Sequence, residues 1–434
     1  MTARLITRSF RRKSPLLRID TTPKIRKNLQ KYSLTFFALA ALIALATVAC
    51  GGDSKTASAT TEVSIEARQT QIASTPNPTN TPEVVIVTPT PVLLPIYADG
   101  ILEVHDDSGW LNSDGFKIAD KTADNQVVLV DFWTYTCVNC LRTLPFLREW
   151  QAKYSDRGLV ILGVHTPEFE FEKEIENVRE AIEREGIEWP VVLDNDYGTW
   201  RSFNNRFWPA KYLIGVDGQL HYQHFGEGGY VEVEKEIRRA LTEAGHDISD
   251  IPIGAIDNAD RDPAANRITR ELYGGYERNY TQNGIYAGQE DYYIEPDSSR
   301  EYEDIAAYTP QQWFLQGLWT NGPESIIHAR ETENLEDHIA FHFVGRSANV
   351  VLNPTKTESF SVYIEIDDRP LTPEEAGLDI EFDDEGRSYI SVDEPRLYAI
   401  IEAPEFGEHI VKLASNSDDF AIFAFTFGVN ESGI

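Results

Sequence analysis

Sulfur is scarce in this chain, which has three cysteines, Cys50, Cys137 and Cys140, and a single methionine at its first position. Cys137 and Cys140 form a CxxC pair, but the second pair that would complete a zinc site is missing. Basic residues are also few, because 39 Lys and Arg stand against 70 Asp and Glu, for a net charge of −31. A surface this acidic repels phosphate groups, which argues against nucleic-acid binding.

The N-terminus has the pattern of an export signal. Residues 1–49 contain ten Lys and Arg and one acid, a net charge of +9, and they end in an uncharged apolar stretch at 34–48. We predict that residues 1–49 are a signal peptide, whose removal changes the net charge from −31 to −40. Thr47-Val48-Ala49-Cys50 resembles a bacterial lipobox, which predicts lipidation of Cys50. A plain cleaved signal and an uncleaved anchor are the alternatives, and all three place the rest of the chain outside the cytoplasm.

The composition divides the remainder of the chain. Residues 50–97, including TPNPTNTPEVVIVTPTPV, are rich in Thr, Ser, Ala and Pro and cannot bury enough apolar surface to fold, so they are expected to be an extended tether. About 340 residues follow, which suggests two domains. We predict one domain at 98–247, a linker at 248–266, and a second domain at 267–430.

The first of these domains alternates strand and helix patterns. Residues 127–132 are a continuous apolar run, typical of a strand buried on both faces. Asp217-Gly218 between two strand patterns is a hairpin signal. The full pattern predicts strands at 127–132, 159–164, 191–193, 211–216 and 220–225, and helices at 140–154, 172–185, around Trp200 and Phe203, and through Val233, Ile237 and Leu241. This order predicts a three-layer α/β domain.

The second domain has a different pattern. Short alternating runs such as SFSVYIEIDD, LYAIIEA and FAIFAFTFG are separated by turn residues, and no helix longer than a turn or two is evident. This pattern predicts an antiparallel β-sandwich.

The CxxC pair lies where the predicted strand 127–132 passes into a helix. The first turn of a helix offers unpaired N–H groups and a positive dipole end, which favour a thiolate. Cys137 is at that turn and is predicted to be the attacking nucleophile, and Cys140, one turn further and more buried, is predicted to resolve the mixed disulfide. A purely structural disulfide would close too small a loop to stabilise the fold much.

The surrounding motif resembles the thioredoxin active site, Asp-Phe-Trp-x-x-x-Cys-x-x-Cys followed by Pro, through residues Asp131, Phe132, Trp133, Cys137, Cys140 and Pro145. The resemblance implies a thioredoxin fold and no cofactor beyond the redox-active Cys137–Cys140 disulfide. It implies that Asp131 is a buried carboxylate that takes a proton from the resolving thiol, the alternative being a strand-end acid that faces water.

Further residues acquire roles from the same resemblance. Trp133 is similar to the aromatic residue beside the dithiol, and plain core packing is its alternative. Pro145 is expected to kink the helix. Pro209 stands where thioredoxins keep a cis proline, which would let the backbone of Trp208 pair with an extended substrate; an ordinary trans proline is the alternative.

The predicted helix and strand at 172–193 resemble the insertion of the TlpA/ResA class of exported thiol-disulfide reductases. Residues 98–245, with FWTYTCVNCLRTLPFL and LDNDYGTWRSFNNRFWPAKYLI, are closer still to DipZ-type cytochrome c biogenesis proteins, and the second domain resembles the sandwich that follows in them. In that family the sandwich is similar to carbohydrate-binding modules. The implied partners are disulfides of exported proteins or apocytochrome c, a separate transmembrane electron donor of the CcdA type, and a glycan at the second domain.

Two departures from these families matter. Asn139 stands where thioredoxins usually carry Pro, and because the residues between the cysteines tune thiolate stability, the direction of electron flow is not carried over. DipZ-type proteins include a transmembrane electron conduit, whereas this chain has only its N-terminal apolar stretch.

Other candidates are weaker. His165 and Glu168 follow the second predicted strand and either border the site or lie in a surface loop. In the second domain, a sugar platform or core packing could each explain the aromatic residues Trp313, Trp319 and Tyr286. The clusters Asp367-Asp368 and Asp383-Asp384-Glu385 are candidate calcium ligands, although solvated loops explain them better, and no metal site is predicted.

Three functions compete. The leading hypothesis is a membrane-tethered thiol-disulfide oxidoreductase outside the cytoplasm. A peroxiredoxin-like thiol peroxidase is the second, because Thr134 lies three residues before Cys137, although Val130 stands where such enzymes have Pro. The third is a glycan-binding or surface-binding lipoprotein with an auxiliary dithiol.

Overall fold

The computed structural model describes residues 102–254, 267–281 and 284–429. The predicted signal peptide, Cys50 and the tether to residue 97 lie outside the described residues, so their assignments stay predictions.

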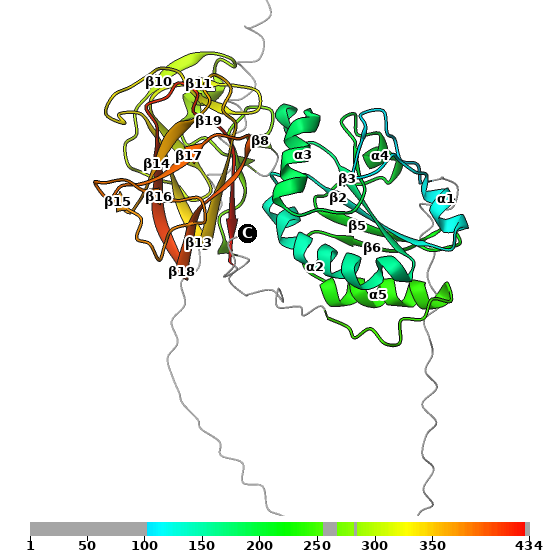
Figure 1. The fold of residues 1–434 in the computed structure, drawn as a ribbon. Helices are drawn as coiled ribbons and strands as arrows, with labels where there is room; N and C mark the ends of the chain where they lie inside the picture. The colour runs from blue at the N-terminus through cyan, green and yellow to red at the C-terminus, as the bar shows by residue number, and fades with distance from the viewer. Residues whose placement is uncertain (1–101, 255–266, 282–283, 430–434) are drawn as a thin grey trace, which may run out of the picture. The chain divides into compact units, whose positions relative to one another are not determined.

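Residues 102–254 form the predicted α/β domain (Figure 1). Its elements in chain order are β1 (Trp110–Leu111), α1 (Ile118–Ala123), β2 (Val127–Trp133), α2 (Val138–Tyr154), η2 (Ser155–Arg157), β3 (Leu159–His165), η3 (Glu170–Lys173), α3 (Ile175–Arg184), β4 (Val191–Leu193), α4 (Gly198–Ser202), β5 (Ala210–Ile214), β6 (Leu220–Phe225) and α5 (Tyr230–Glu243).

The six strands form one mixed sheet in the order β1-β4-β3-β2-β5-β6. All seven residues of β2 are buried, because the strand pairs with β3 on one edge and β5 on the other and is covered on both faces. Val127 and Leu129 join the apolar core that contains residues of α2, α3 and α5. Val128 and Val130, which point the opposite way, join a second core with residues of α1 and β5. The predicted three-layer arrangement is confirmed.

Helix α2 begins directly after Cys137, whose backbone is extended (φ −82°, ψ 105°) and whose sulfur accepts the first-turn N–H of Cys140. Its buried face contains Leu144, Leu147 and Trp150, spaced as one side of a helix. Pro145 lies inside the helix at an exposed position, where the missing N–H costs one backbone hydrogen bond but no side chain is displaced from the core.

The predicted thioredoxin fold with a central insertion is confirmed. The insertion consists of η3, α3 and β4, and a turn with Gly218 at φ 74° joins β5 to β6 as the Asp217-Gly218 signal predicted. The two short elements β1 and α1 were not predicted, because two and six residues are too few for a periodic pattern.

The described part of the second domain is built almost entirely of strands. These are β7 (Leu272–Tyr273), β8 (Tyr280–Thr281), β9 (Gly284–Ile285), β10 (Ser299–Tyr302), β11 (Trp313–Asn321), β12 (Ile326–His328), β13 (His338–Leu352), β14 (Phe360–Ile366), β15 (Arg369–Pro370), β16 (Glu381–Phe382), β17 (Ser388–Val392), β18 (Arg396–Ala414) and β19 (Ala421–Gly428), with one short 3-10 helix, η5 (Glu290–Tyr293).

The all-β prediction is confirmed, and the connectivity adds detail to it. Eleven strands form one hydrogen-bonded antiparallel sheet rather than two separate ones. The long strands β13 and β18 pair along most of their length, with register shifts at Gly345/Ser347 and Ala348/Asn349. Strand β11 pairs with β13 through its first half and with β12 through its second, so β11, β12, β19 and β13 close a circuit around an apolar core.

A buried carboxylate ties three segments of this domain together. Asp337, whose side chain is 1% exposed, accepts hydrogen bonds from Arg330, from the backbone N–H of Leu318 at 3.1 Å and from His328 Nε2 at 3.0 Å. Burial alone would raise the pKa of Asp337, but these donors together hold it below its ordinary value.

We predict that Asp337→Asn lowers the free energy of unfolding of this domain by about 3 kcal/mol or more, because one partner of a buried charged network is removed. Urea unfolding followed by tryptophan fluorescence measures the change, since Trp319 lies beside His328 with ring centroids 5.1 Å apart. Asp418→Asn is the matched control, because Asp418 pairs with Lys356 in partial exposure to solvent, and its midpoint should move far less. Equal midpoints for the two variants would contradict the prediction.

Candidate active site

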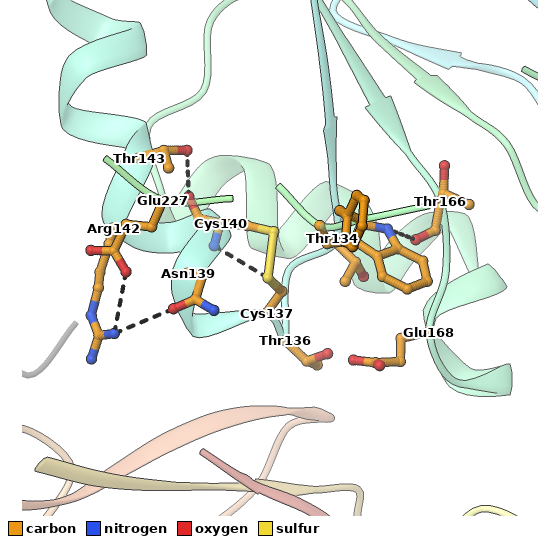
Figure 2. The surroundings of a disulfide bond; sticks show 12 residues. Thr134, Thr136, Cys137, Asn139, Cys140, Arg142, Thr143, Thr166, Glu168 and Glu227 are labelled. Carbon is orange, nitrogen blue, oxygen red and sulfur yellow. Dashed lines mark hydrogen bonds and ion pairs between the residues drawn. A yellow bond between two sulfur atoms is a disulfide. The ribbon is translucent and has the colours of Figure 1, made fainter. Parts of the chain in front are cut away.

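The two cysteines lie where β2 gives way to α2, and they form a disulfide with Cα atoms 5.2 Å apart (Figure 2). Cys137 is the N-cap of α2, and its sulfur accepts the backbone N–H of Cys140 at 3.2 Å. Cys137 is half-buried and Cys140 is fully buried. Cys137 is therefore the accessible member of the pair, whereas Cys140 lies in the apolar core behind it. This difference in exposure fits the predicted attacking and resolving roles.

Asp131 is buried beneath the site rather than exposed at a strand end. Its side chain is 1% exposed, and Lys211, directly opposite it on β5, places Nζ 3.1 Å from Oδ1. Burial raises the pKa of Asp131, and the Lys211 charge opposes that rise. The solvent-facing alternative is excluded, and a carboxyl whose pKa is raised by burial suits the predicted role of accepting a proton from the resolving thiol. Lys211 was missed, although a lysine in the apolar run AKYLI was a visible signal.

The three residues predicted to contact substrate differ in exposure. Trp133 is buried and belongs to the apolar core that also contains Cys140, so the core-packing alternative describes its ring. Trp208 is half-buried and packs against the same core, as Cys137 does. The Trp208–Pro209 peptide bond is cis, as predicted. The indole N–H of Trp208 donates to the carbonyl of Thr166 at 3.2 Å.

A cation that the sequence reasoning missed lies next to the variable residue of the CxxC motif. Asn139 is exposed, and its side-chain oxygen accepts a hydrogen bond from Arg142 at 3.4 Å. Arg142 is nearly buried and also pairs with Glu227 at 3.6 Å. Figure 2 shows dashed lines from the Arg142 guanidinium to both Asn139 and Glu227. Its spacing of two residues after Cys140 was the only signal available in the sequence.

His165 is neither a pocket edge nor a surface residue, so both expectations for it are corrected. It is the last residue of β3 and is fully buried, stacked on Tyr135 with ring centroids 5.6 Å apart and within 3.3 Å of the Thr134 hydroxyl. Burial lowers the pKa of His165 to about 3. The imidazole is therefore neutral throughout the physiological range and supports the loop before Cys137.

Glu168 is mostly buried as well, and its carboxylate accepts from Tyr273 at 2.8 Å and pairs with Arg278. A second acid of the same segment, Glu172, is fully buried and accepts the Thr136 hydroxyl at 2.5 Å. Sequence reasoning missed Glu172, because its place in the acidic run EFEFEK gave no sign of burial.

Most of the remaining candidate residues of the second domain are either buried in its core or paired with basic side chains. Trp313 and Trp319 are fully buried and Tyr286 is 8% exposed, so these rings pack in the core and form no sugar platform. Among the acid clusters, Asp367 pairs with His409, Asp368 with Lys412, and Asp383 with Arg387. Within the described residues, no group of three or more His, Cys, Asp or Glu side chains is arranged to hold a metal ion.

Comparison with known families agrees with this site. Residues 111–237 match the family described as Redoxin, and residues 269–428 match the family described as thioredoxin-like C-terminal domain. Residues 111–237 are therefore similar to thioredoxin-like thiol-disulfide oxidoreductases.

Individual relatives cover different parts of it. Protein DipZ of Mycobacterium bovis is 41% identical over 182 residues, which are 41% of this chain and 26% of the relative. Thiol-disulfide oxidoreductase YkuV of Bacillus subtilis is 28% identical over 141 residues, 32% of this chain and 93% of the relative. A solved thioredoxin-like protein in the oxidized form is 27% identical, with 33% of this chain and 95% of that chain covered and a TM-score of 0.31. The chain spans about a quarter of the length of the DipZ proteins it matches.

We predict that His165 gives the fold a distinct acid sensitivity. A histidine in the unfolded chain has a pKa of about 6.5, and folded His165 has a pKa of about 3. Between these two pH values the unfolded chain therefore binds one more proton at this residue than the folded protein does. The free energy of unfolding therefore falls as the pH drops from about 6.5 towards 3, with a slope of about 1.4 kcal/mol per pH unit from this residue.

Urea unfolding of the wild type and of His165→Phe at a series of pH values measures this slope. Phe keeps a ring between Tyr135 and Trp133 but does not titrate. The variant should therefore lose the contribution of His165 to the pH dependence of the free energy of unfolding between about pH 6 and 4. The comparison cancels groups common to both proteins. Parallel curves for the two proteins across that range would refute the prediction.

Proposed function

We propose that this protein is a membrane-tethered thiol-disulfide oxidoreductase outside the cytoplasm that reduces disulfides of exported proteins. The observation that carries the proposal is the Cys137–Cys140 pair, with one sulfur half-exposed at the N-terminus of α2 and the other buried behind it. The helix N-terminus favours the Cys137 thiolate, and the short Cα separation lets the second sulfur reach the first without movement of the backbone.

The reaction would proceed in two exchanges. The Cys137 thiolate attacks one sulfur of the substrate disulfide, forms a mixed disulfide and releases the other substrate sulfur as a thiolate. Cys140 then loses its proton and attacks the sulfur of Cys137, which releases the second substrate thiol and leaves Cys137 and Cys140 oxidised. Two electrons have passed to the substrate. Asp131, buried beside Lys211, is the group we assign to accept the proton of Cys140.

Substrate recognition is assigned to the backbone of Trp208 next to Pro209. Trp208 packs against the core that Cys137 also borders, so an extended substrate segment paired with this backbone would pass near the exposed sulfur. Main-chain pairing gives affinity with little sequence preference, which suits an enzyme that acts on many exported proteins.

The location and partners are extrapolated from the predicted signal, the Cys50 lipobox and the resemblance to DipZ-type proteins. We assign apocytochrome c, or other exported disulfides, as substrate and a separate transmembrane protein of the CcdA type as electron donor. None of the helices in the described part of the chain is long and apolar enough to cross a membrane. In this proposal the anchor is the N-terminal lipid on Cys50.

The direction of electron flow is decided by the reduction potential of the Cys137–Cys140 pair. A value near that of thioredoxin, about −270 mV, is expected for the proposed reductase, and equilibration with glutathione or dithiothreitol buffers measures it. A value near −120 mV would mean an oxidase instead.

The two alternative functions receive less support. A thiol peroxidase would use the hydroxyl of Thr134 near the Cys137 sulfur, but Thr134 is fully buried and lies against His165. Turnover with hydrogen peroxide but not with insulin would favour the peroxidase. Glycan binding loses its best aromatic candidates, because the indole rings of Trp313 and Trp319 are in the core.

We predict that Cys140→Ser traps substrates as mixed disulfides through Cys137, because the resolving thiol is gone. The full-length variant is expressed in a bacterial membrane, free thiols are blocked, and covalent partners are identified after non-reducing electrophoresis. Cys137→Ser is the matched control and should trap nothing. Absence of any covalent partner from exported Cys140→Ser protein would count against the exchange mechanism.

A further inference from the structure

A fully buried carboxyl lies beside the active-site loop and has no part in the exchange chemistry described above. Glu172 belongs to η3, which follows β3 after a short loop, and its side chain is 0% exposed. One oxygen accepts the Thr136 hydroxyl at 2.5 Å. The other accepts the backbone N–H of Phe169 at 3.0 Å and that of Glu168. Burial of a carboxyl is costly, so three donors converging on one side chain indicate a specific role.

Thr136 connects this carboxyl to the dithiol, since it is the residue immediately before Cys137 and is itself 2% exposed. Figure 2 shows the Thr136 side chain beside Cys137 and pointing towards Glu168, away from the disulfide. The hydroxyl of Thr136 therefore anchors the last loop residue before the N-cap of α2. If this anchor moved, the sulfur of Cys137 would move relative to the N–H groups that favour its thiolate.

The rest of the loop has further anchors, although Thr134 also interacts with the Glu172 carboxyl. Thr134 contacts His165, Tyr135 stacks on the same imidazole, and the backbone N–H of Thr166 donates to the carbonyl of Trp133 at 3.0 Å. Those contacts come from the end of β3 and fix the beginning of the loop. Glu172 supplies the side-chain hydrogen bond at its other end, next to the nucleophile.

We propose that Glu172 is a positioning residue of the dithiol, which acts through Thr136 to hold the loop before Cys137 and so sets the reactivity of the Cys137 sulfur. The inference rests on the proposed role of Cys137 as the attacking nucleophile. It assigns Glu172 no contact with substrate.

The protonation state of Glu172 should then matter near neutral pH. Burial, with a contribution from the nearby Glu168 charge, raises the pKa of Glu172 to about 7 against the opposing effect of the Thr136 hydrogen bond. The ionised Glu172 carboxylate can only accept hydrogen bonds, which suits the three donors that surround it. In the protonated carboxyl one oxygen carries a hydrogen and acts as a donor, so one of the three hydrogen bonds must rearrange.

Other charged or titratable groups face this carboxyl. Tyr135 from the loop and Tyr197 from the segment after β4 both interact electrostatically with Glu172. Glu168 is the nearest acid and is itself paired with Arg278. Burial raises the pKa of Tyr135 far above neutrality and that of Tyr197 to about 12, so neither tyrosine loses its proton in the range where Glu172 does.

The test measures the alkylation of Cys137 by iodoacetamide between pH 4 and 9 in full-length protein carrying Cys140→Ser, so that Cys137 is the reactive thiol of the pair. We expect a profile with two ionisations, one of them near pH 7. Glu172→Gln should remove that step and change the plateau rate by about threefold to tenfold, the equivalent of one hydrogen bond. Thr136→Val should do the same, and Thr136→Ser, which keeps the hydroxyl, should restore the profile.

Matched variants separate positioning from general stability. Glu170→Gln alters an exposed acid of the same turn and should leave the profile unchanged. Glu172→Gln combined with Thr136→Val should have no larger effect than either change alone, because the two act through one bond. If Glu172→Gln does not fold, Thr136→Val and Thr136→Ser still carry the test.

An unchanged pH profile in Thr136→Val would overturn the inference, whatever Glu172→Gln does to stability. An additive double variant would overturn it as well, because Glu172 would then act by another route. Failure of the proposed function looks different: the single variant Cys137→Ser, which keeps Cys140, would retain disulfide reductase activity.

Discussion

The whole site depends on the way strand β2 is held at the centre of its sheet. All seven of its residues pair in parallel with β3, from Val127 opposite Leu159 to Trp133 opposite His165, and residues 128–132 pair antiparallel with β5 on the other edge. Both faces are covered by apolar cores. A strand that is paired on both edges and covered on both faces cannot slide or rotate without losing hydrogen bonds to its neighbours or exposing apolar side chains. The C-terminal end of β2 therefore sets where the loop before Cys137 begins.

That constraint also explains how side chains from distant parts of the chain reach the dithiol. The neighbouring strands bring one residue each to β2: β3 ends with His165 opposite Trp133, and β5 places Lys211 opposite Asp131. Both are buried, and both contact groups on β2 or on the loop that follows. The register of the sheet therefore brings residues that are distant in the sequence to the strand and loop before the dithiol.

Burial gives these groups protonation behaviour that they would lack in water. It raises the pKa of Asp131 and of Glu172 and lowers that of His165, so the acids hold protons more readily and the base less readily than usual. The two kinds of shift act on stability in opposite directions. Asp131 and Glu172 lower the free energy of unfolding as the pH rises above the pKa that each carboxyl has in the unfolded chain. His165 lowers it as the pH falls below about 6.5, the pKa of an unfolded histidine. Perturbed pKa values of this kind cluster at functional sites more than elsewhere.

The sequence predicted the parts of the site that depend on neighbours along the chain. The apolar run before the dithiol, the CxxC spacing and the Trp208-Pro209 dipeptide are local signals, and the strand, the helix and the cis bond they predicted are present. Contacts that depend on strand register were not accessible. Lys211 meets Asp131 only because β5 runs antiparallel to β2 in one particular register. His165 is neither at a pocket edge nor in a surface loop, because β3 continues one residue beyond its predicted end and the imidazole stacks on Tyr135.

The charges around the dithiol bear directly on the direction of electron flow. A cation or helix N-terminus near Cys137 stabilises the thiolate, hence the reduced form, and makes the pair more oxidising. Arg142 brings such a cation to Asn139, in the middle of the motif, but Glu227 pairs with it and offsets part of its charge. The position that usually carries Pro is thus linked through Arg142 to an acid on the segment between β6 and α5. The residue between the two cysteines is therefore part of a three-residue chain of contacts that joins Asn139, Arg142 and Glu227.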